Sequence, residues 1–316
     1  MIIVRVPFRV SLFGGSTDYE SFYKHHGSFL IGGTIDKYIY LSMRYRPKLL
    51  SEKSLVVYSK MEEVRDFDEI TNPLIREILK FRNISKTVEF HSFSDIRART
   101  GLGGSSSYCV GLLYLLDQLT NSVIAKKQLV RDAIHVERYI LKESGGIQDQ
   151  IWPVYGGLNT IEITNEGNFF VKPLSLSEDF VKEFESNLLL IYTGKQRDCG
   201  SVADSHDGKD KIAILQLAKE AHGSLLKENI EKIGSLVYQS WKEKLNISNL
   251  ISTSEVDAII DHVMSRGAYG AKLLGAGGCG FVVCVCNPKL KQEFSEYFNG
   301  KTLDFEFENK GVTRIY

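Results

Sequence analysis

Three glycine-rich segments hold most of the residues whose types and spacing could bind an anion: 7–19, 101–107 and 272–281. The second reads Gly-Leu-Gly-Gly-Ser-Ser-Ser, and residues 108–119 after it are apolar on most sides, as in a buried helix. Glycines let several backbone N–H groups point at one spot, and a helix N-terminus adds partial positive charge there. We therefore predict that this loop binds a phosphate, with its serine hydroxyls on phosphate oxygens or on a magnesium ion. A flexible turn capped by a serine is the plainer alternative.

Two familiar phosphate-binding motifs are excluded by what surrounds the glycines. A P-loop needs a lysine at its end, and none lies between Gly101 and Leu116. The dinucleotide fingerprint occurs formally at Gly275, Gly277 and Gly280, but that fingerprint must open a helix. Residues 281–286, Phe-Val-Val-Cys-Val-Cys, are typical of a strand instead. We interpret the third segment as a glycine loop that lies close to another group, without binding NAD.

Glu137 stands in an otherwise apolar stripe of a predicted helix over residues 126–143. Val130, Ile134 and Leu141 are the other members of that stripe at helical spacing. A buried lone charge is costly, so Glu137 needs a partner. A magnesium ion and a salt bridge to a lysine or arginine are equally compatible with the pattern.

Asp149 follows the end of the same helix, after two glycines. A partly buried aspartate at this position could accept the proton of an attacking hydroxyl. It could equally be a turn aspartate that bonds its own backbone, and Asp18 allows the same interpretation. Arg9, on a predicted strand, could simply face solvent.

The remaining pattern indicates an α+β fold. Apolar residues alternate with polar ones over residues 4–11, the period of a half-buried strand. The other predicted strands are at 28–44, 88–93, 158–163, 188–192, 272–274 and 281–286. The predicted helices are at 73–81, 108–119, 126–143, 209–226, 230–245 and 254–266. The weakest seam lies at about 165–179, and we place a domain boundary there.

Composition excludes several classes of protein. With 39 Lys and Arg against 39 Asp and Glu the formal charge is zero, and no basic run is visible, so we expect no nucleic-acid partner. Nowhere do 18 apolar residues run uninterrupted, so we expect no membrane span. The N-terminus has no secretory pattern, and five cysteines without metal-ligand spacing indicate reduced thiols. Both observations favour a cytoplasmic protein.

Taken together, the segments resemble the signature motifs of the GHMP kinases. Residues 9–19, 101–107 and 275–281 match the three motifs in the expected order. Within this superfamily the chain looks like the bacterial D-glycero-D-manno-heptose 7-phosphate kinases, a branch similar to the kinase domain of fucokinases. That branch is indicated by residues 13–19, 146–150, 155–157 and 192–194.

The resemblance implies a two-domain α+β fold with the active site in the cleft between the domains. Residues 1–170 would form an ATP-binding domain like the second domain of ribosomal protein S5, and residues 171–316 a ferredoxin-like domain. ATP and Mg²⁺ would be the cofactors and a sugar phosphate the acceptor, while the oligomeric state stays open, with a homodimer as one option.

The resemblance also implies roles for individual residues. Asp149 would be the general base and Arg9 would help to polarise the attacking hydroxyl. Ser105, or its neighbour Ser106, would bind the nucleotide's magnesium together with Glu137. The ATP-binding residues would be Gly101, Leu102, Gly103, Gly104, Ser105, Ser106 and Ser107. The substrate-binding residues would be Gly15, Ser16, Thr17, Asp18, Gly277 and Gly278, with Lys195 and Arg197 as candidates for a distal phosphate.

The implied reaction is transfer of the γ-phosphoryl group of ATP to the anomeric hydroxyl of D-glycero-D-manno-heptose 7-phosphate, giving the 1,7-bisphosphate used for nucleotide-activated heptose. Gly15-Ser16 stands where galactokinases carry Glu-His, which counts against galactose. Gly104 replaces the usual Ser or Thr, so one phosphate contact is absent. Two alternatives remain: a kinase of an unphosphorylated sugar such as fucose, and a non-catalytic sugar sensor.

Overall fold

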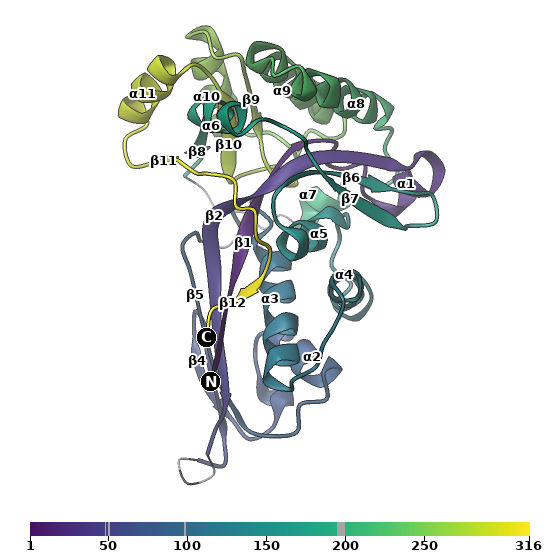
Figure 1. Cartoon of the computed structure of the whole chain (residues 1–316), viewed down its shortest axis with the longest axis vertical. Helices are drawn as coiled ribbons and strands as arrows, with labels where there is room; N and C mark the ends of the chain where they lie inside the picture. Colours follow the sequence, from purple (N-terminus) through teal and green to yellow (C-terminus); the bar gives the residue numbers. More distant parts are fainter. Residues whose placement is uncertain (48, 50, 98, 195–199) are drawn as a thin grey trace.

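Two sheets organise the chain, each with helices packed against it (Figure 1). The structure is a computed structural model, and it describes residues 1–47, 49, 51–97, 99–194 and 200–316. The first sheet has eight strands: β1 (Ile2–Phe13), β2 (Ser28–Tyr45), β3 (Ser54–Val57), β4 (Met61–Val64), β5 (Val88–Ser94), β6 (Leu158–Ile163), β7 (Phe169–Pro173) and β12 (Thr313–Arg314). The second has four: β8 (Leu188–Tyr192), β9 (Gly270–Leu273), β10 (Phe281–Val285) and β11 (Thr302–Leu303).

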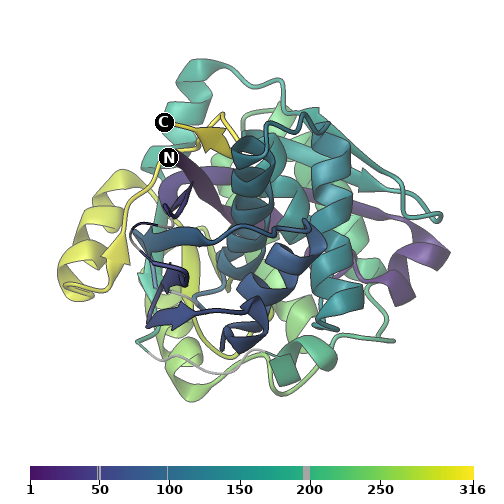
Figure 2. The same ribbon diagram turned by 90° about the horizontal axis from the view of Figure 1, so that it is seen from below.

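The long hairpin of β1 and β2 is the spine of the first sheet. The strand order in this sheet is β12-β1-β2-β5-β3-β4. Strand β6 pairs with the first half of β2, and β7 pairs with β6. Because β12 pairs with β1, the two termini of the chain lie side by side, as Figures 1 and 2 show. The predicted boundary after residue 170 falls inside β7, so this sheet extends to Pro173 and takes in the C-terminus. A division into two domains near there stays a prediction.

The helices of the first part are α1 (Glu20–His26), α2 (Pro73–Phe81), α3 (Gly104–Leu119), α4 (Lys126–Ile134), a π-helix η2 (His135–Ile140) and α5 (Gln148–Tyr155), with a short 3₁₀ helix η1 (Phe67–Glu69). The central one is α3, which contacts β1, β2, α4 and α5. Most of its side chains are buried, as its uncharged sequence predicts. Its first turn therefore lies inside the molecule, where the N–H groups can meet a ligand.

The helices of the second part are α6 (Glu178–Ser186), α7 (Gly200–Asp204), α8 (Ile212–Leu226), α9 (Ile230–Leu245), α10 (Ser254–Ser265) and α11 (Pro288–Tyr297). Strand β8 is apolar on both faces because each face belongs to a different core. Leu188 and Leu190 join the core of the first sheet, whereas Leu189 and Ile191 pack with α10 and β9 residues. Helix α8 contacts β1 and β2, so the two parts pack together directly.

The predicted strands and helices are all present, with shifted ends. The helix predicted over 126–143 is the main exception, since α4 ends at Ile134, η2 follows, and neither reaches residue 143. Asp149, which was expected just past the end of that helix, lies in the first turn of a further helix, α5. Helices α1, α6, α7 and α11 were not predicted, because each is ten residues or shorter and gives only a short periodic signal.

Candidate active site

A cleft of about 1240 Å³ lies where the end of β1, the first turn of α3, α5 and the β9–β10 loop meet. It receives side chains from both parts of the molecule, including His206 after α7 and Lys244 of α9. Among the sequence-predicted residues, those that line it are Arg9, Gly15, Ser16, Asp18, Gly101, Gly103, Gly104, Ser105, Ser106, Glu137 and Asp149.

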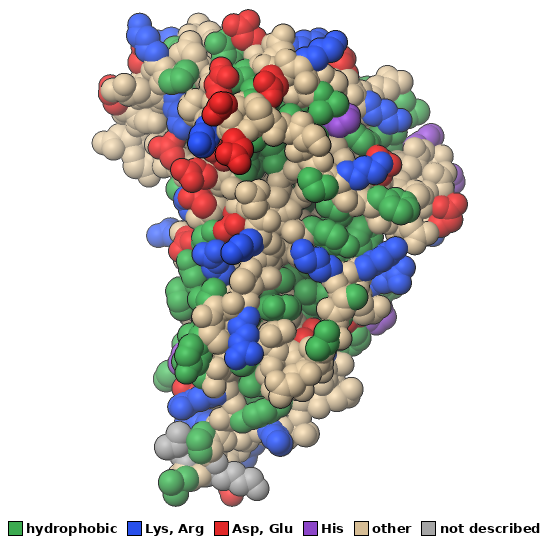
Figure 3. All heavy atoms as spheres, viewed as in Figure 1, with side chains coloured by type: hydrophobic (Ala, Val, Ile, Leu, Met, Phe, Trp, Pro, Cys, Tyr) green, Lys and Arg blue, Asp and Glu red, His purple; other side chains and the backbone are tan. Residues whose placement is uncertain are grey.

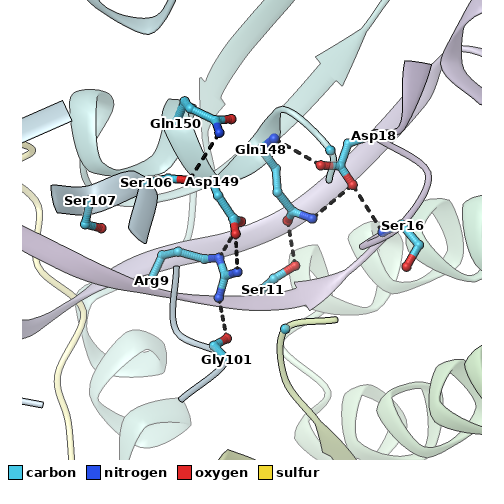
Figure 4. Close-up of polar contacts among 12 residues, drawn as sticks. Arg9, Ser11, Ser16, Asp18, Gly101, Ser106, Ser107, Gln148, Asp149 and Gln150 are labelled. Carbon is cyan, nitrogen blue, oxygen red and sulfur yellow. Dashed lines mark hydrogen bonds and ion pairs between the residues drawn. The ribbon is translucent and has the colours of Figure 1, made fainter. Parts of the chain in front are cut away.

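Arg9 and Asp149 form a two-point ion pair at the centre of the cleft (Figure 4). Arg9 Nε donates to Asp149 Oδ1 and Nη2 donates to Oδ2, each at 2.8 Å. The Arg9 side chain is 3% exposed, whereas that of Asp149 is 29% exposed and faces the open cleft. This fork holds the carboxylate in one orientation, so it can accept a proton from a hydroxyl placed in the cleft.

The same arginine ties the second glycine loop to the site. Its Nη1 donates to the carbonyl oxygen of Gly101 at 2.7 Å, and its backbone N–H donates to Leu102 O at 3.1 Å. Gly101 has a φ of +79°, and a Cβ there would lie 2.8 Å from Leu274 O. The position therefore requires glycine on both conformational and steric grounds.

Within the predicted ATP loop, some residues face the cleft and others hold the loop in place. Leu102 is fully buried, and Ser107 Oγ donates to Pro7 O at 3.0 Å, so both anchor the loop to β1. Gly103 caps α3 in the left-handed conformation, and the N-terminus of α3 opens toward the cleft. That arrangement suits an anion bound by main-chain N–H groups.

Ser106, Glu137 and Gln150 form a buried polar cluster beside this helix terminus. Ser106 Oγ lies 3.0 and 2.8 Å from the two carboxylate oxygens of Glu137, and Gln150 Nε2 donates to the same carboxylate. The structure thus pairs Ser106 with Glu137, while Ser105, one residue earlier on α3, is exposed in the cleft. The reason is the helical rotation of about 100° per residue, which turns Ser106 inward and Ser105 outward.

Burial raises the pKa of Glu137 to about 7, against smaller opposing effects of Arg138, Gln150 and Ser106. The local geometry comes from η2, where the backbone widens to a π-helix around Glu137. From the sequence we expected the partner of Glu137 to be a magnesium ion or a lysine or arginine. In the structure, Ser106 and Gln150 already bond the carboxylate, so it needs neither of them.

This cluster fits a magnesium ion that is also bound by a nucleotide. Hydroxyl and carboxylate oxygens are the donors that Mg²⁺ prefers, and it commonly takes only one or two protein ligands plus phosphate oxygens and water. In keeping with this, the described part of the chain has no group of three or more His, Cys, Asp or Glu side chains that could hold a metal without further ligands. The buried Oε1 of Gln150 has no hydrogen-bond partner, while the Nε2 of the same amide faces Ser106 and Glu137.

Asp18 lies on the other side of Asp149 and is almost fully buried. Its carboxylate accepts from the backbone N–H of Gln148 at 3.0 Å, from Gln148 Nε2 at 3.0 Å and from the backbone N–H of Ser16 at 3.1 Å. Ser11 Oγ donates to Gln148 Oε1 at 2.8 Å, which fixes the amide orientation. Burial raises the pKa of Asp18, and the nearby Asp149 adds to that rise. This row of polar groups can orient the hydroxyls of an acceptor.

His206 belongs to the site although nothing in the sequence singled it out. Its Nδ1 is 2.8 Å from Ser16 Oγ and its Nε2 is 2.9 Å from the carbonyl oxygen of Ala276. Burial lowers its pKa to about 3, so the ring is neutral and bridges the first glycine segment and the third. The ring also stacks on Tyr19, 5.8 Å between centroids. A lone histidine in a polar stretch gives no sequence signal for such a bridge.

Three predicted substrate residues do not line the cleft in the structure. Thr17 is buried and donates to Gly14 O at 2.7 Å, so it stabilises the turn after β1. Gly277 and Gly278 pack instead against Ile251 and Val202, while Gly275 and Ala276 of the same loop line the cleft. The two residues predicted to bind the substrate's distal phosphate, Lys195 and Arg197, lie outside the described residues.

Comparison with known proteins identifies the class. A family model described as the GHMP kinases N terminal domain matches residues 71–157, and one described as GHMP kinases C terminal matches residues 221–299. Together they cover more than half of the chain, which therefore belongs to the GHMP kinases. It is an ATP-dependent phosphotransferase with an alcohol group as acceptor.

Particular relatives are similar over the whole length. The chain is 27% identical to D-glycero-alpha-D-manno-heptose 7-phosphate kinase of Campylobacter jejuni, covering 98% of each protein. It is 24% identical to the bifunctional fucokinase/GDP-fucose pyrophosphorylase of Arabidopsis thaliana over 65% of this chain and 21% of that protein. Among solved structures, a D-glycero-D-manno-heptose 1-phosphate kinase from Bacteroides thetaiotaomicron superposes with a TM-score of 0.82 at 21% identity, covering 100% of this chain and 99% of that one. The last likeness confirms the predicted GHMP kinase fold.

The surface adds two observations. Lys and Arg side chains are scattered among acidic and apolar ones on the face in Figure 3, without a continuous basic patch. Over the residues that the structure describes, the helices are too short or too polar to cross a bilayer.

Proposed function

We propose that this chain is a sugar kinase that phosphorylates the anomeric hydroxyl of D-glycero-D-manno-heptose 7-phosphate. The observation that carries the proposal is the Arg9–Asp149 pair, which lies between the N-terminus of α3 and the polar row of Asp18, Gln148 and Ser16. A nucleotide on one side and a polyol on the other would meet at Asp149. The 27% identity to a heptose 7-phosphate kinase over the full length supports the acceptor.

In this mechanism the chain supplies position and charge. The N–H groups at the start of α3 would bind the phosphates, and Ser106 and Glu137 would hold the nucleotide's magnesium ion, which would neutralise charge on the transferred group. Asp18 and Gln148 orient the acceptor hydroxyls. Arg9 fixes the Asp149 carboxylate and would help to polarise the attacking hydroxyl beside it. Asp149 accepts the hydroxyl proton, which is worth about 10²–10⁴-fold in rate.

We further propose that the reaction takes place in the cytoplasm. ATP is the phosphoryl donor of this family, and the described cysteines Cys109, Cys284 and Cys286 are free thiols. Reduced thiols are the rule in a reducing compartment.

The test is a substrate panel with purified protein, ATP and Mg²⁺, read as ADP formed and as phosphorylated product by ³¹P NMR. Heptose 7-phosphate should have the highest kcat/KM, and a new phosphorus signal should appear at the anomeric position. Higher kcat/KM on fucose or another unphosphorylated sugar would replace the proposed acceptor. No ADP formation with any sugar, but tight sugar binding, would support a sensor.

The Asp149→Asn variant tests the role of the base. It keeps the shape of the side chain and one hydrogen bond to Arg9 but cannot take up the proton. We expect ADP binding by calorimetry to stay near that of the parent protein, and kcat to fall by about 10²–10⁴-fold. A variant that turns over nearly as fast as the parent would remove Asp149 from the mechanism.

A further inference from the structure

Two lysines in the cleft have no acid to pair with among the described residues. Lys244 of α9 donates through Nζ to the carbonyl oxygen of Gly275 at 2.5 Å, and Lys272 of β9 donates to that of Leu12 at 2.5 Å. Lys272 is buried and Lys244 is partly buried, and both line the cleft. Within the described part of the chain, the charged groups that act on them are Arg9 on both and Lys244 on Lys272, all of the same sign.

When the lysines are protonated, this cluster therefore holds positive charge that no carboxylate among the described residues offsets at either lysine. Burial and Arg9 lower the pKa of Lys244 to about 7, and burial with the two neighbouring cations lowers that of Lys272 well below its usual range. The carboxylate at the reaction centre, Asp149, is already bonded at both oxygens by Arg9. Buried cations without a counter-ion are costly, so a bound anion would stabilise them.

Lys272 bonds Leu12 and Lys244 lies near His206, which relates both lysines to the acceptor side, while Gly275, which Lys244 also bonds, packs against Gly101 of the second glycine loop. Leu12 is three residues beyond Arg9 on β1, a distance of about 10 Å at the rise of a strand. Lys244 is near enough to His206 to lower that ring's pKa, and His206 bonds Ser16. In Figure 4, Ser106 and Ser107 lie on one side of the Arg9–Asp149 pair and Asp18 and Ser16 on the other. The nucleotide's phosphates thus have their own site across the centre, at α3.

We propose that Lys244 and Lys272 bind the phosphate group that the acceptor sugar already carries, and so select a sugar phosphate over a neutral sugar. The inference rests on the proposed function, since a kinase of unphosphorylated sugars would have no anion to place there. An ammonium is a compact donor that binds phosphate as a point charge, and two of them suit a dianion. A neutral sugar would leave both ammonium groups without a counter-ion.

The test compares Lys244→Met with Lys242→Met, since Lys242 is exposed two residues earlier on the same helix. Both variants are assayed on heptose 7-phosphate and on the same heptose without its phosphate. We expect Lys244→Met to raise KM for the sugar phosphate by about 10- to 100-fold, because that is the change in affinity that the loss of a hydrogen bond to a charged group produces. KM for ATP should stay unchanged. On the dephosphorylated heptose its kcat/KM should equal that of the parent. Lys242→Met should match the parent throughout, and Lys244→Arg should recover most of the affinity.

The outcomes separate the two proposals. If the parent protein turns over heptose 7-phosphate but Lys244→Met raises KM for ATP instead, the lysines serve the nucleotide and this inference is overturned. If Lys244→Met lowers kcat/KM equally on both heptoses, the phosphate is not what Lys244 recognises, and the inference is again overturned. If the parent protein prefers an unphosphorylated sugar, the proposed function itself fails. ADP binding by calorimetry shows that each variant is folded.

Discussion

Replacing Glu137 by glutamine should change how the stability of the protein depends on pH. Glu137 is 1% exposed, and burial raises the pKa of its carboxyl to about 7 from an ordinary value of 4.5. Its proton is therefore bound more tightly in the folded protein than in the unfolded chain. Between these two pKa values the folded state holds the extra proton, so the free energy of unfolding falls as pH rises through this window.

The magnitude follows from the two pKa values. One pKa unit is worth about 1.4 kcal/mol. Integrated from about pH 5 to about pH 8, the extra proton binding of the folded state changes the free energy of unfolding by about 2–3 kcal/mol. The amide of the Glu137→Gln variant does not titrate, so this part of the pH dependence should vanish. The new amide can still accept from Ser106, and the unpartnered Oε1 of Gln150 can accept from its NH₂ group after the Gln150 amide rotates. We therefore expect a folded variant that gains relative stability at high pH.

The assay is urea unfolding of both proteins at several pH values from about 5 to about 8, with EDTA and without nucleotide. Other buried acids titrate equally in the two proteins, so the informative quantity is the difference between their unfolding free energies at each pH. That difference should shift by about 2–3 kcal/mol in favour of Glu137→Gln across the range. Glu293→Gln, at an exposed acid of α11 that does not act on Glu137, is the matched control. Parallel pH profiles of parent and Glu137→Gln would refute the reasoning.

Three further predictions concern activity and stability. Since protons compete with Mg²⁺ for Glu137, the Mg²⁺ concentration for half-maximal rate should rise as pH falls below about 7, and a flat dependence would remove Glu137 from the metal site. Arg9→Lys keeps the positive charge but loses the two-point hydrogen bonding to Asp149, so kcat should fall by about tenfold or more while ADP binding is retained. An unchanged kcat would show that the two-point contact is not needed. Gln148→Leu removes a hydrogen-bond donor from the buried carboxylate of Asp18, so the free energy of unfolding should drop by about 1–3 kcal/mol. An unchanged free energy of unfolding would show that the protein does not need this amide.

The fold could largely be predicted because its main elements have strong local signals. The alternation in β1 does mark a strand, although from Val6 to Phe13 both of its faces are buried and the strand is not half-buried as predicted. The uncharged run in α3 is buried as its pattern requires. The change from α-helix to π-helix between α4 and η2 could not be predicted, since the apolar residues keep their α-helical spacing on both sides of Glu137. The π-helix depends on the contacts that the Glu137 carboxylate makes in the folded protein. Strand β12 is two residues long and forms only because β1 offers it an edge.

The site could be predicted where a motif surrounds the residue. Arg9, Asp18, Glu137 and Asp149 all face the cleft, although their chemical roles remain proposals. Lys244 was missed because a lysine in the last turn of an amphipathic helix is ordinarily solvated, and only the tertiary packing of α9 on the β9–β10 loop buries its ammonium. Such long-range contacts leave no mark at the residue's own position.

The contact between the second and third glycine loops leads to one more prediction. Gly101 packs on Leu274 and Gly275, and a Cβ at Gly275 would lie only 2.6 Å from Gly101 Cα. Gly101→Ala puts a methyl group 2.8 Å from Leu274 O at a φ of +79°. The left-handed conformation alone costs about 1–2 kcal/mol for alanine, and the backbone contact cannot yield as a side chain would. The loops must therefore separate, which also moves the carbonyl that Arg9 bonds.

We expect Gly101→Ala to lower both the unfolding free energy, by at least about 1 kcal/mol, and kcat/KM for ATP. The control is Gly223→Ala, at an exposed helical position where a Cβ meets nothing within 4 Å. That variant should leave activity unchanged and stabilise the protein by about 0.5–1 kcal/mol, because alanine favours the helix. If Gly101→Ala instead kept the parent's kcat/KM for ATP, the close contact of the two loops would not be what shapes the nucleotide site. The N–H groups of α3 would then bind the phosphates independently of the second part of the molecule.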